Sequence, residues 1–124
     1  MIVGVGIDVV EISRVEEKLA YRVLSTEELS IWNKGKNRSF LAGRFALKEA
    51  FLKAIGTGIR DVKLANLSFL PDELGAIHLL PNDTVTQLEI TYNFDTVHST
   101  LAHDGGIATA VVILEKRRGD FRDD

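Results

Sequence analysis

Two carboxylate residues in this sequence could act together in a chemical site. Asp8 lies in an apolar stretch at residues 2–10, and Glu49 lies in a segment of helical spacing at residues 40–55. If that helix packs across that strand, the two carboxylates meet. Mg²⁺ takes one or two carboxylates together with water and substrate phosphates, because it keeps a rigid octahedral shell of oxygens. The alternative is that Asp8 caps a local turn and Glu49 pairs with Lys53.

Basic residues accompany Glu49 on the same segment, at Arg44, Lys48 and Lys53. At about 100° per residue, Arg44 and Lys48 fall inside the apolar arc of the helix and Lys53 lies at its edge. Such side chains can extend along apolar surface without any further role. Beside a metal held by carboxylates, they would instead offset the charge of a phosphoryl group. The spacing leaves both interpretations open.

A histidine and a row of cations are the other candidates. His103 precedes the loop at 104–106, where functional side chains concentrate, although a turn histidine is an equal alternative. The histidines show no metal-ligand pair at helical spacing, so we do not expect zinc. Arg14, Lys18 and Arg22 recur every four residues and form a basic strip on a predicted helix. A solvated helix face explains the strip, and docking of an acidic partner is the alternative.

The first half of the chain contains the elements that must position these residues. Residues 1–10 read as a strand on which Asp8 shares a face with Gly4 and Gly6, and that face admits close approach by a ligand or a helix. Residues 11–24 have helical spacing, and Ser25 with Glu28 forms a capping-box pattern for the next helix. We expect Ser39 to cap the long helix. The sequence also predicts that Gly56 and Gly58 end it.

The second half is richer in strand signals. We expect strands at 67–70, 76–80, 96–102 and 107–115, with a turn near residues 71–75. The pattern at residues 82–92 suggests a helix. The β-branched residues of this segment argue against it, because they favour strands. The chain thus predicts a single α+β domain at 1–118, an antiparallel sheet packed against a long helix. A frayed tail is expected at 119–124.

The composition narrows the classes of function. The chain has 124 residues, no cysteine and a formal net charge of −3. Disulfides, zinc–thiolate sites and thiol nucleophiles are excluded, and the charge gives no overall attraction to nucleic acid. The apolar N-terminus is interrupted by Asp8 and Glu11, so we expect no export signal, no membrane partner and a cytoplasmic location.

Three sequence blocks resemble one enzyme family. The blocks are GVGIDVVEISRVEEKL at 4–19, FLAGRFALKEAFLKAIGTGI at 40–59, and STLAH with IATAVVILE at 99–115. They are similar, in order and spacing, to the signatures of bacterial holo-[acyl-carrier-protein] synthases, the small group of 4′-phosphopantetheinyl transferases. The resemblance implies transfer of 4′-phosphopantetheine from coenzyme A to a serine of acyl carrier protein, with adenosine 3′,5′-bisphosphate released. It also implies Mg²⁺, a part in fatty acid biosynthesis, and a homotrimer with active sites at subunit interfaces.

The resemblance assigns roles to individual residues. It makes Asp8 and Glu49 the Mg²⁺ ligands and, with Lys53 at the transferring phosphate, the catalytic residues. The base that takes the serine proton is then Glu49 or a Mg²⁺-bound water. Arg14 faces the carrier protein, and we extend that surface to Lys18 and Arg22. The positions expected to contact coenzyme A are Arg44, Lys48, Gly56, Gly58, His103 and Thr100.

Two departures from the family and two rival functions remain. The region between the strand at 76–80 and the third block lacks the Gly-x-Pro segment that is frequent in the family, so that loop is expected to differ in shape. Ala102 stands directly before His103, where the family commonly has a hydroxyl residue, while Thr100 keeps an earlier hydroxyl. A non-catalytic coenzyme A or nucleotide-binding module would need the basic cluster without both carboxylates. A structural oligomerisation domain would have no use for the charged edge of the long helix. That helix carries more apolar residues than one face of a small monomer would bury, and we expect an interface along it.

Overall fold

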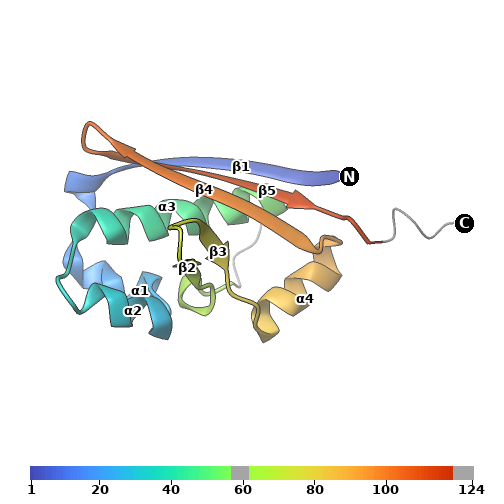
Figure 1. The fold of residues 1–124 in the computed structure, drawn as a ribbon, viewed down its shortest axis with the longest axis horizontal. Coiled ribbons are helices and arrows are strands. Elements are labelled where there is room, and N and C mark those ends of the chain that lie inside the picture. The colour runs from blue at the N-terminus through green and yellow to red at the C-terminus, as the bar shows by residue number, and fades with distance from the viewer. Residues whose placement is uncertain (57–61, 119–124) are drawn as a thin grey trace, which may run out of the picture.

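The computed structural model describes residues 1–56 and 62–118, so Gly58 and the expected tail lie outside the described residues. Its main sheet has three antiparallel strands in the order β1–β5–β4, formed by Ile2–Glu11, Ile107–Glu115 and Thr96–Asp104 (Figure 1). Gly105 and Gly106 connect β4 to β5 with φ angles of 58° and 78°. A two-residue hairpin loop with positive φ at both positions matches the twist of the strands, and glycine adopts it without strain.

The long helix α3 (Arg38–Ile55) crosses the inner face of this sheet. It begins because the Asn37 side chain accepts the backbone N–H groups of Ser39 and Phe40, and it ends at Gly56, where φ is 121°. The expected end at Gly56 is confirmed. Ser39 was the wrong cap, because Asn37 already satisfies these free N–H groups and starts the helix earlier.

Directly after β1 the chain forms η1 (Ile12–Arg14) at the end of the main sheet, where the Ile12 N–H donates to the Gly106 carbonyl oxygen. The other elements are η2 (Glu17–Leu19), α1 (Ala20–Val23), α2 (Thr26–Trp32), η3 (Leu64–Asn66), the β2–β3 hairpin (Phe69–Pro71 and Ile77–Leu79) and α4 (Asp83–Tyr92). Helices α1, α2 and α4 lie on the other side of α3 from the main sheet (Figure 1). This α+β architecture, the helix near 82–92 and the four later strands confirm the predictions. The chain itself covers α3 on both sides, so the expectation that an interface buries it is wrong.

The segment at 11–24 is not the continuous helix that its spacing predicts. The backbone is extended at Val15 (φ −88°, ψ 118°) and at Glu16 (φ −90°, ψ 144°), which separates η1 from η2. Val15 is buried there, so tertiary packing of its β-branched side chain overrides the helical pattern. None of the helices formed by the described residues is long and apolar enough to cross a membrane.

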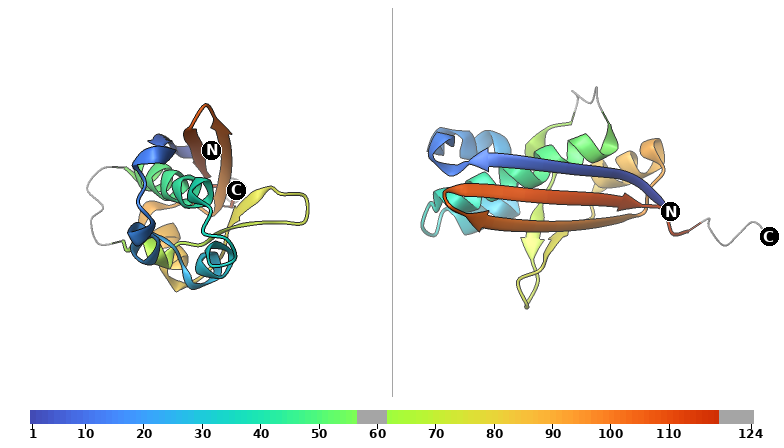
Figure 2. Two further views of the ribbon diagram at one scale, coloured as in Figure 1. Left: turned by 90° about the vertical axis from the view of Figure 1, so that its left-hand side faces the viewer. Right: turned by 90° about the horizontal axis from the view of Figure 1, so that it is seen from above.

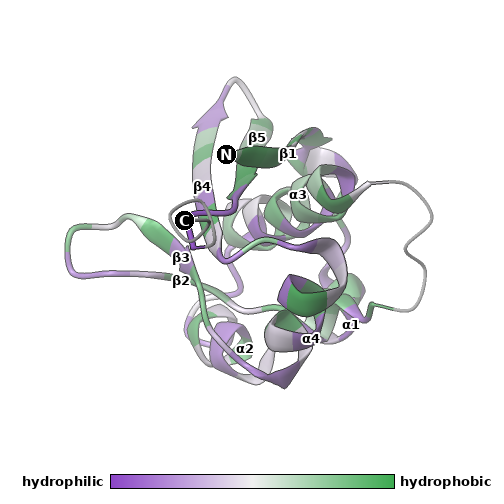
Figure 3. Ribbon diagram, turned by 90° about the vertical axis from the view of Figure 1, so that its right-hand side faces the viewer, coloured by the Kyte–Doolittle hydropathy of each residue, from purple (hydrophilic) through white to green (hydrophobic). Residues whose placement is uncertain are grey.

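The outer face of the main sheet carries apolar side chains that no described element covers. Val5, Ile7 and Val9 on β1 are 61%, 55% and 59% exposed. The strand register aligns them with Ile113, Val111 and Thr109 of β5. In the right-hand panel of Figure 2 the three strands lie in front of the other elements, and Figure 3 shows strongly hydrophobic colouring along β1. We call these six residues the outer sheet face.

Candidate active site

Asp8 projects from the inner face of β1 toward α3, as the alternation of the strand predicts. Its neighbours on that face are glycines because the helix backbone comes very close. A Cβ atom at Gly4 would lie 2.0 Å from the Ala54 carbonyl oxygen, and one at Gly6 would lie 1.9 Å from that of Ala50. Any larger residue would push the helix away. The two glycines therefore allow the close packing that places Asp8 beside the edge of α3.

Three charged residues meet at this edge: Asp8, Glu49 and Lys53. Lys53 Nζ lies 2.9 Å from Asp8 Oδ1 and donates a second hydrogen bond to the Ile7 carbonyl oxygen at 3.1 Å. Glu49 is half-buried, and burial together with the Asp8 charge raises the pKa of Glu49, while Lys53 opposes the shift. Desolvation and a nearby like charge both disfavour an ionised carboxylate. The repulsion between the two carboxylates would likewise favour the binding of a cation between them.

Asp8 and Glu49 line one open cleft of about 1550 Å³. The predicted residues Arg14 and His103 line it as well, and so does Arg38 from the first turn of α3. His103 Nε2 donates to the Ser39 carbonyl oxygen at 3.0 Å, which holds the ring against the start of α3. The cleft thus joins the two carboxylates, Arg14 and His103 in one site.

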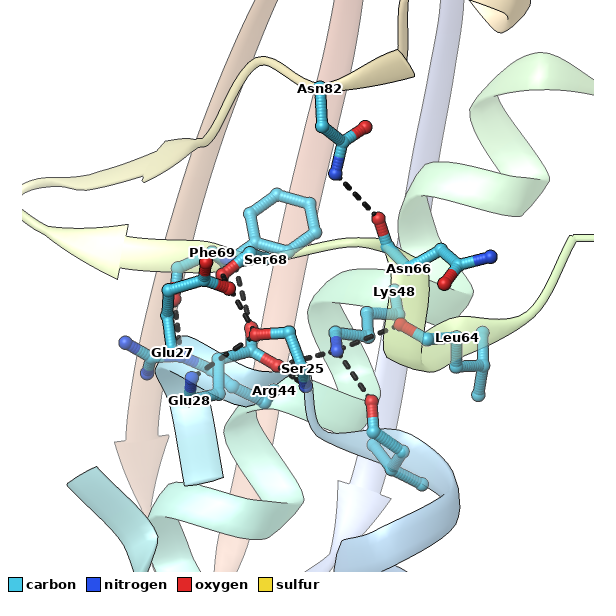
Figure 4. Close-up of polar contacts among 11 residues, drawn as sticks. Ser25, Glu27, Glu28, Arg44, Lys48, Leu64, Asn66, Ser68, Phe69 and Asn82 are labelled. Atoms are coloured by element: carbon cyan, nitrogen blue, oxygen red, sulfur yellow. Dashed lines mark hydrogen bonds and ion pairs between the residues drawn. The ribbon is translucent and has the colours of Figure 1, made fainter. Parts of the chain in front are cut away.

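Arg44 and Lys48 are buried instead and are not among the residues that line the cleft. Figure 4 shows the polar contacts that they make. Arg44 Nε donates to the Phe69 carbonyl oxygen at 2.9 Å, and its guanidinium lies 4.3 Å from the centre of the Phe40 ring. Lys48 is fully buried against Glu28. Burial lowers the pKa of Lys48, and Glu28 opposes that shift. The prediction that these two cations bind coenzyme A is therefore wrong, because their charges are used inside the fold.

Thr100 lies on the opposite face of the sheet from the cleft of its own chain, and its contact with coenzyme A stays a prediction. It pairs with Val111 on β5, which in turn pairs with Ile7, so Thr100 belongs to the exposed side of the sheet. Asp8 pairs with Ala110 on the inner side. Within one chain the sheet therefore separates Thr100 from the cleft. Gly56 follows Lys53 by less than one helical turn, and its proposed contact with a nucleotide stays a prediction.

The predicted basic strip is broken along with its helix. Arg14 lies on η1, Lys18 on η2 and Arg22 on α1, so the three side chains do not follow one helical face. Arg14 Nε is 3.2 Å from Glu11 Oε1, and Lys18 Nζ is 3.3 Å from Glu16 Oε1. All three are exposed, and only Arg14 lines the cleft. Their role in docking stays a prediction.

Two functional features escaped the sequence reasoning. Arg38 stands in a polar loop by sequence, and only the start of α3 at that residue places it at the cleft. Glu28 was read as a capping residue, which it is: Ser25 N–H donates to Glu28 Oε1 at 2.9 Å, and Glu28 N–H donates to Ser25 Oγ at 3.1 Å. Its second role as the partner of Lys48 had no local signal, since the two residues are 20 positions apart.

Comparison with known proteins gives the class to which this fold and cleft belong. The model of the 4′-phosphopantetheinyl transferase superfamily matches residues 4–112. The chain is 43% identical over 122 residues to the holo-[acyl-carrier-protein] synthase of Thermotoga maritima, covering 98% of this chain and 68% of that protein. It belongs to the holo-[acyl-carrier-protein] synthase family of that superfamily, as the three sequence blocks predict.

Solved structures agree with this assignment. The holo-[acyl-carrier-protein] synthase of Neisseria meningitidis matches with a TM-score of 0.84 at 33% identity, covering 94% of this chain and 100% of that one. The enzyme of Bacillus anthracis, solved in complex with coenzyme A (3′,5′-ADP), matches with a TM-score of 0.79 at 34% identity. The match covers 94% of this chain and 99% of that one.

Proposed function

We propose that this protein transfers the 4′-phosphopantetheine arm of coenzyme A to a serine of apo-acyl carrier protein and releases adenosine 3′,5′-bisphosphate. One observation carries the proposal: Asp8, Glu49 and Lys53 converge at one edge of α3, in a chain that belongs to the synthase family. The complex of the Bacillus anthracis relative with coenzyme A supports the same substrate. The cysteine-free composition fits the reducing cytoplasm, where we place the reaction.

The residues present fit a Mg²⁺ ion. The described residues contain no group of three or more His, Cys, Asp or Glu side chains that could hold a metal, which argues against a site built from protein ligands alone. Mg²⁺ needs only one or two carboxylates beside water and substrate phosphates, and Asp8 and Glu49 supply two. When bound, the ion would polarise the pyrophosphate oxygens of coenzyme A.

The chain's own residues position and neutralise the reacting groups. The carrier serine attacks the β-phosphorus, and such transfers depend on positioning and charge neutralisation more than on covalent help from the enzyme. Lys53, exposed at the mouth of the carboxylate pair, would offset charge on the leaving bisphosphate. Glu49, at the carboxylate edge, is within the group of residues that could accept the serine proton. Arg14, at the same cleft, would contact the acidic carrier protein.

The protein is further proposed to work as a homotrimer with its active sites between subunits. The outer sheet face supports this, because apolar strand residues rarely stay exposed on a monomer of this size. A β-sheet with one bare apolar face gains stability when a second copy covers it. The bare face, rather than α3, is then the surface through which copies associate.

A single assay separates this function from its rivals. The protein is incubated with apo-acyl carrier protein, coenzyme A and Mg²⁺, and the carrier is weighed by mass spectrometry. A gain of one phosphopantetheine arm that disappears with EDTA supports the transferase. Coenzyme A binding with no gain in mass would identify a binding module. If the protein neither binds coenzyme A nor transfers the arm, the remaining explanation is a structural oligomerisation domain.

A further inference from the structure

Lys53 places a positive charge on the carboxylate that we assign to the metal ion. Its ammonium lies 2.9 Å from Asp8 Oδ1 and 3.1 Å from the Ile7 carbonyl oxygen. The Asp8 side chain is only 15% exposed, whereas that of Lys53 is 56% exposed. Asp8 is therefore fixed in the wall of the cleft. Lys53 reaches it from the solvent side and keeps the freedom to turn elsewhere.

This contact puts two cations in competition for one carboxylate. A divalent ion held by Asp8 and Glu49 would share the Asp8 charge with Lys53 and would be repelled by the ammonium. Charges within about 4–6 Å of each other change binding strongly when the site is partly desolvated. Among the ion pairs of the described residues, Lys53 is the cation that contacts Asp8. The metal ion alone therefore binds against this repulsion.

A pyrophosphate group would remove the competition. Lys53 has a flexible stem and three N–H donors, so it can turn from Asp8 to a phosphoryl oxygen. Asp8 is then released to the metal ion, and the added negative charge attracts both cations. The effect is reciprocal, because a ligand that strengthens the binding of a second ligand is strengthened by it to the same extent.

We propose that Lys53 couples the binding of Mg²⁺ to the binding of coenzyme A, so that the metal ion binds weakly until the pyrophosphate is present. This inference rests on the proposed function for the identity of the two ligands. It adds a second role to Lys53: besides offsetting charge during transfer, the residue controls when the carboxylate pair accepts its metal ion.

Titration calorimetry tests this without any carrier protein. The affinity for Mg²⁺ is measured on the wild type and on Lys53→Met, each with and without saturating coenzyme A. Coenzyme A should tighten Mg²⁺ binding to the wild type about tenfold or more, within the usual range of coupling between sites. Lys53→Met should bind Mg²⁺ alone several-fold more tightly than the wild type, and coenzyme A should then add less. Lys53→Arg keeps the charge and should keep the weak binding of Mg²⁺ alone.

The matched control is Lys34→Met, which removes one charge from an exposed loop residue outside the cleft and should change neither affinity. Circular dichroism and thermal melting confirm that each variant is folded. Equal Mg²⁺ affinity of Lys53→Met and the wild type in the absence of coenzyme A would overturn the inference. A wild type that binds no coenzyme A would instead overturn the proposed function.

Discussion

Lys48 Nζ lies 2.5 Å from Glu28 Oε1 in the interior, and neither side chain has any exposed surface. Lys48 also donates to the carbonyl oxygens of Val23 and Leu64, while Glu28 Oε2 accepts the Phe69 N–H (Figure 4). One ion pair thus ties α3 to α1, α2, η3 and β2. Among the described residues, no buried side-chain nitrogen or oxygen lacks a hydrogen-bond partner, so the charges are fully compensated.

Removing one partner of this pair should destabilise the protein strongly. In Lys48→Met the Glu28 carboxylate stays buried without its counter-charge, and breaking a buried pair in this way costs about 3–5 kcal/mol in free energy of unfolding. Urea denaturation measures the loss. The double variant Lys48→Met with Glu28→Gln should recover part of it, because no unpaired charge is then left inside. Lys18→Met breaks the exposed pair with Glu16 and should cost less than about 1 kcal/mol.

A loss below about 1 kcal/mol for Lys48→Met would contradict this account. It would mean that the Glu28 carboxylate finds water or takes up a proton at little cost, and that the pair contributes no more than a surface pair.

Features with a local cause could be predicted from the sequence. The Ser25–Glu28 capping box forms as expected because both hydrogen bonds join residues three positions apart. Asp8 faces α3 because strand alternation fixes its side and the two glycines make room there. Glu49 and Lys53 share one edge of α3 because they are four residues apart on a helix. The last two of these rules suffice to assemble the carboxylate edge.

Features that depend on packing between segments distant in sequence could not be predicted. Helical spacing placed Lys48 on the apolar arc, where it could be a snorkelling cation or part of a phosphate clamp. Which of the two it is depends on the group that faces its ammonium. That group is the carboxylate of Glu28, 20 positions earlier in the sequence, so Lys48 is not a phosphate clamp. The break at Val15 likewise depends on burial of that side chain. The apolar residues of α3 were expected to be buried by another subunit. They are instead buried by segments of the same chain that are distant in sequence, such as β5, and the sequence pattern of α3 does not reveal them.

Asp8→Ala and Glu49→Ala should abolish transfer while the fold stays intact. Each variant removes one of the two proposed metal ligands, and a lost electrostatic element of a site typically costs about 10²-fold or more in rate. Initial rates of carrier modification measure the loss, and thermal melting checks the fold. Glu73→Ala removes an exposed carboxylate of the β2–β3 turn and should keep full activity. If both variants remain fully active in the presence of EDTA, the metal assignment is wrong.

Asp95 should make folding stability sensitive to acid. Burial raises the pKa of Asp95, but the N–H groups of Arg117 and Arg118 outweigh this and bring it from 3.8 to about 2. A carboxyl with a lowered folded-state pKa stabilises the fold fully above its unfolded pKa, and this is lost as the pH falls through the folded value. Asp95→Asn should therefore lower the urea midpoint at pH 7, and the difference from the wild type should shrink between pH 4 and pH 2. A pH-independent difference would show that the carboxylate charge is not its cause.

The outer sheet face should hold the trimer together. Sedimentation at micromolar concentration should give three times the chain mass of 13.7 kDa. Ile7→Glu places a charge in the middle of that face and should shift the protein to the monomer, because an unpaired charge is costly to bury. Ile90→Glu makes the same change on α4, where the side chain is 72% exposed, and should leave the trimer unchanged. A wild-type monomer would contradict the assembly.

Arg14 should be the main docking contact for the carrier protein. It is the one member of the predicted strip that lines the cleft, while Lys18 and Arg22 lie farther along the chain on η2 and α1. Charges at the rim of an interface steer encounter and fix orientation, and salt screens them over about 8 Å at physiological strength. Arg14→Glu should raise KM for the carrier protein strongly, leave KM for coenzyme A nearly unchanged and flatten the salt dependence.

The comparison among charge reversals makes this test specific. Lys18→Glu and Arg22→Glu should raise the carrier KM less than Arg14→Glu, because neither residue borders the cleft. Lys34→Glu reverses an exposed charge elsewhere and reports the change in overall charge alone. Arg14→Glu also faces the nearby Glu11 carboxylate, so Arg14→Ala separates loss of the cation from added repulsion. Should Arg14→Ala raise KM for coenzyme A but not for the carrier, Arg14 contacts the nucleotide and the docking model fails.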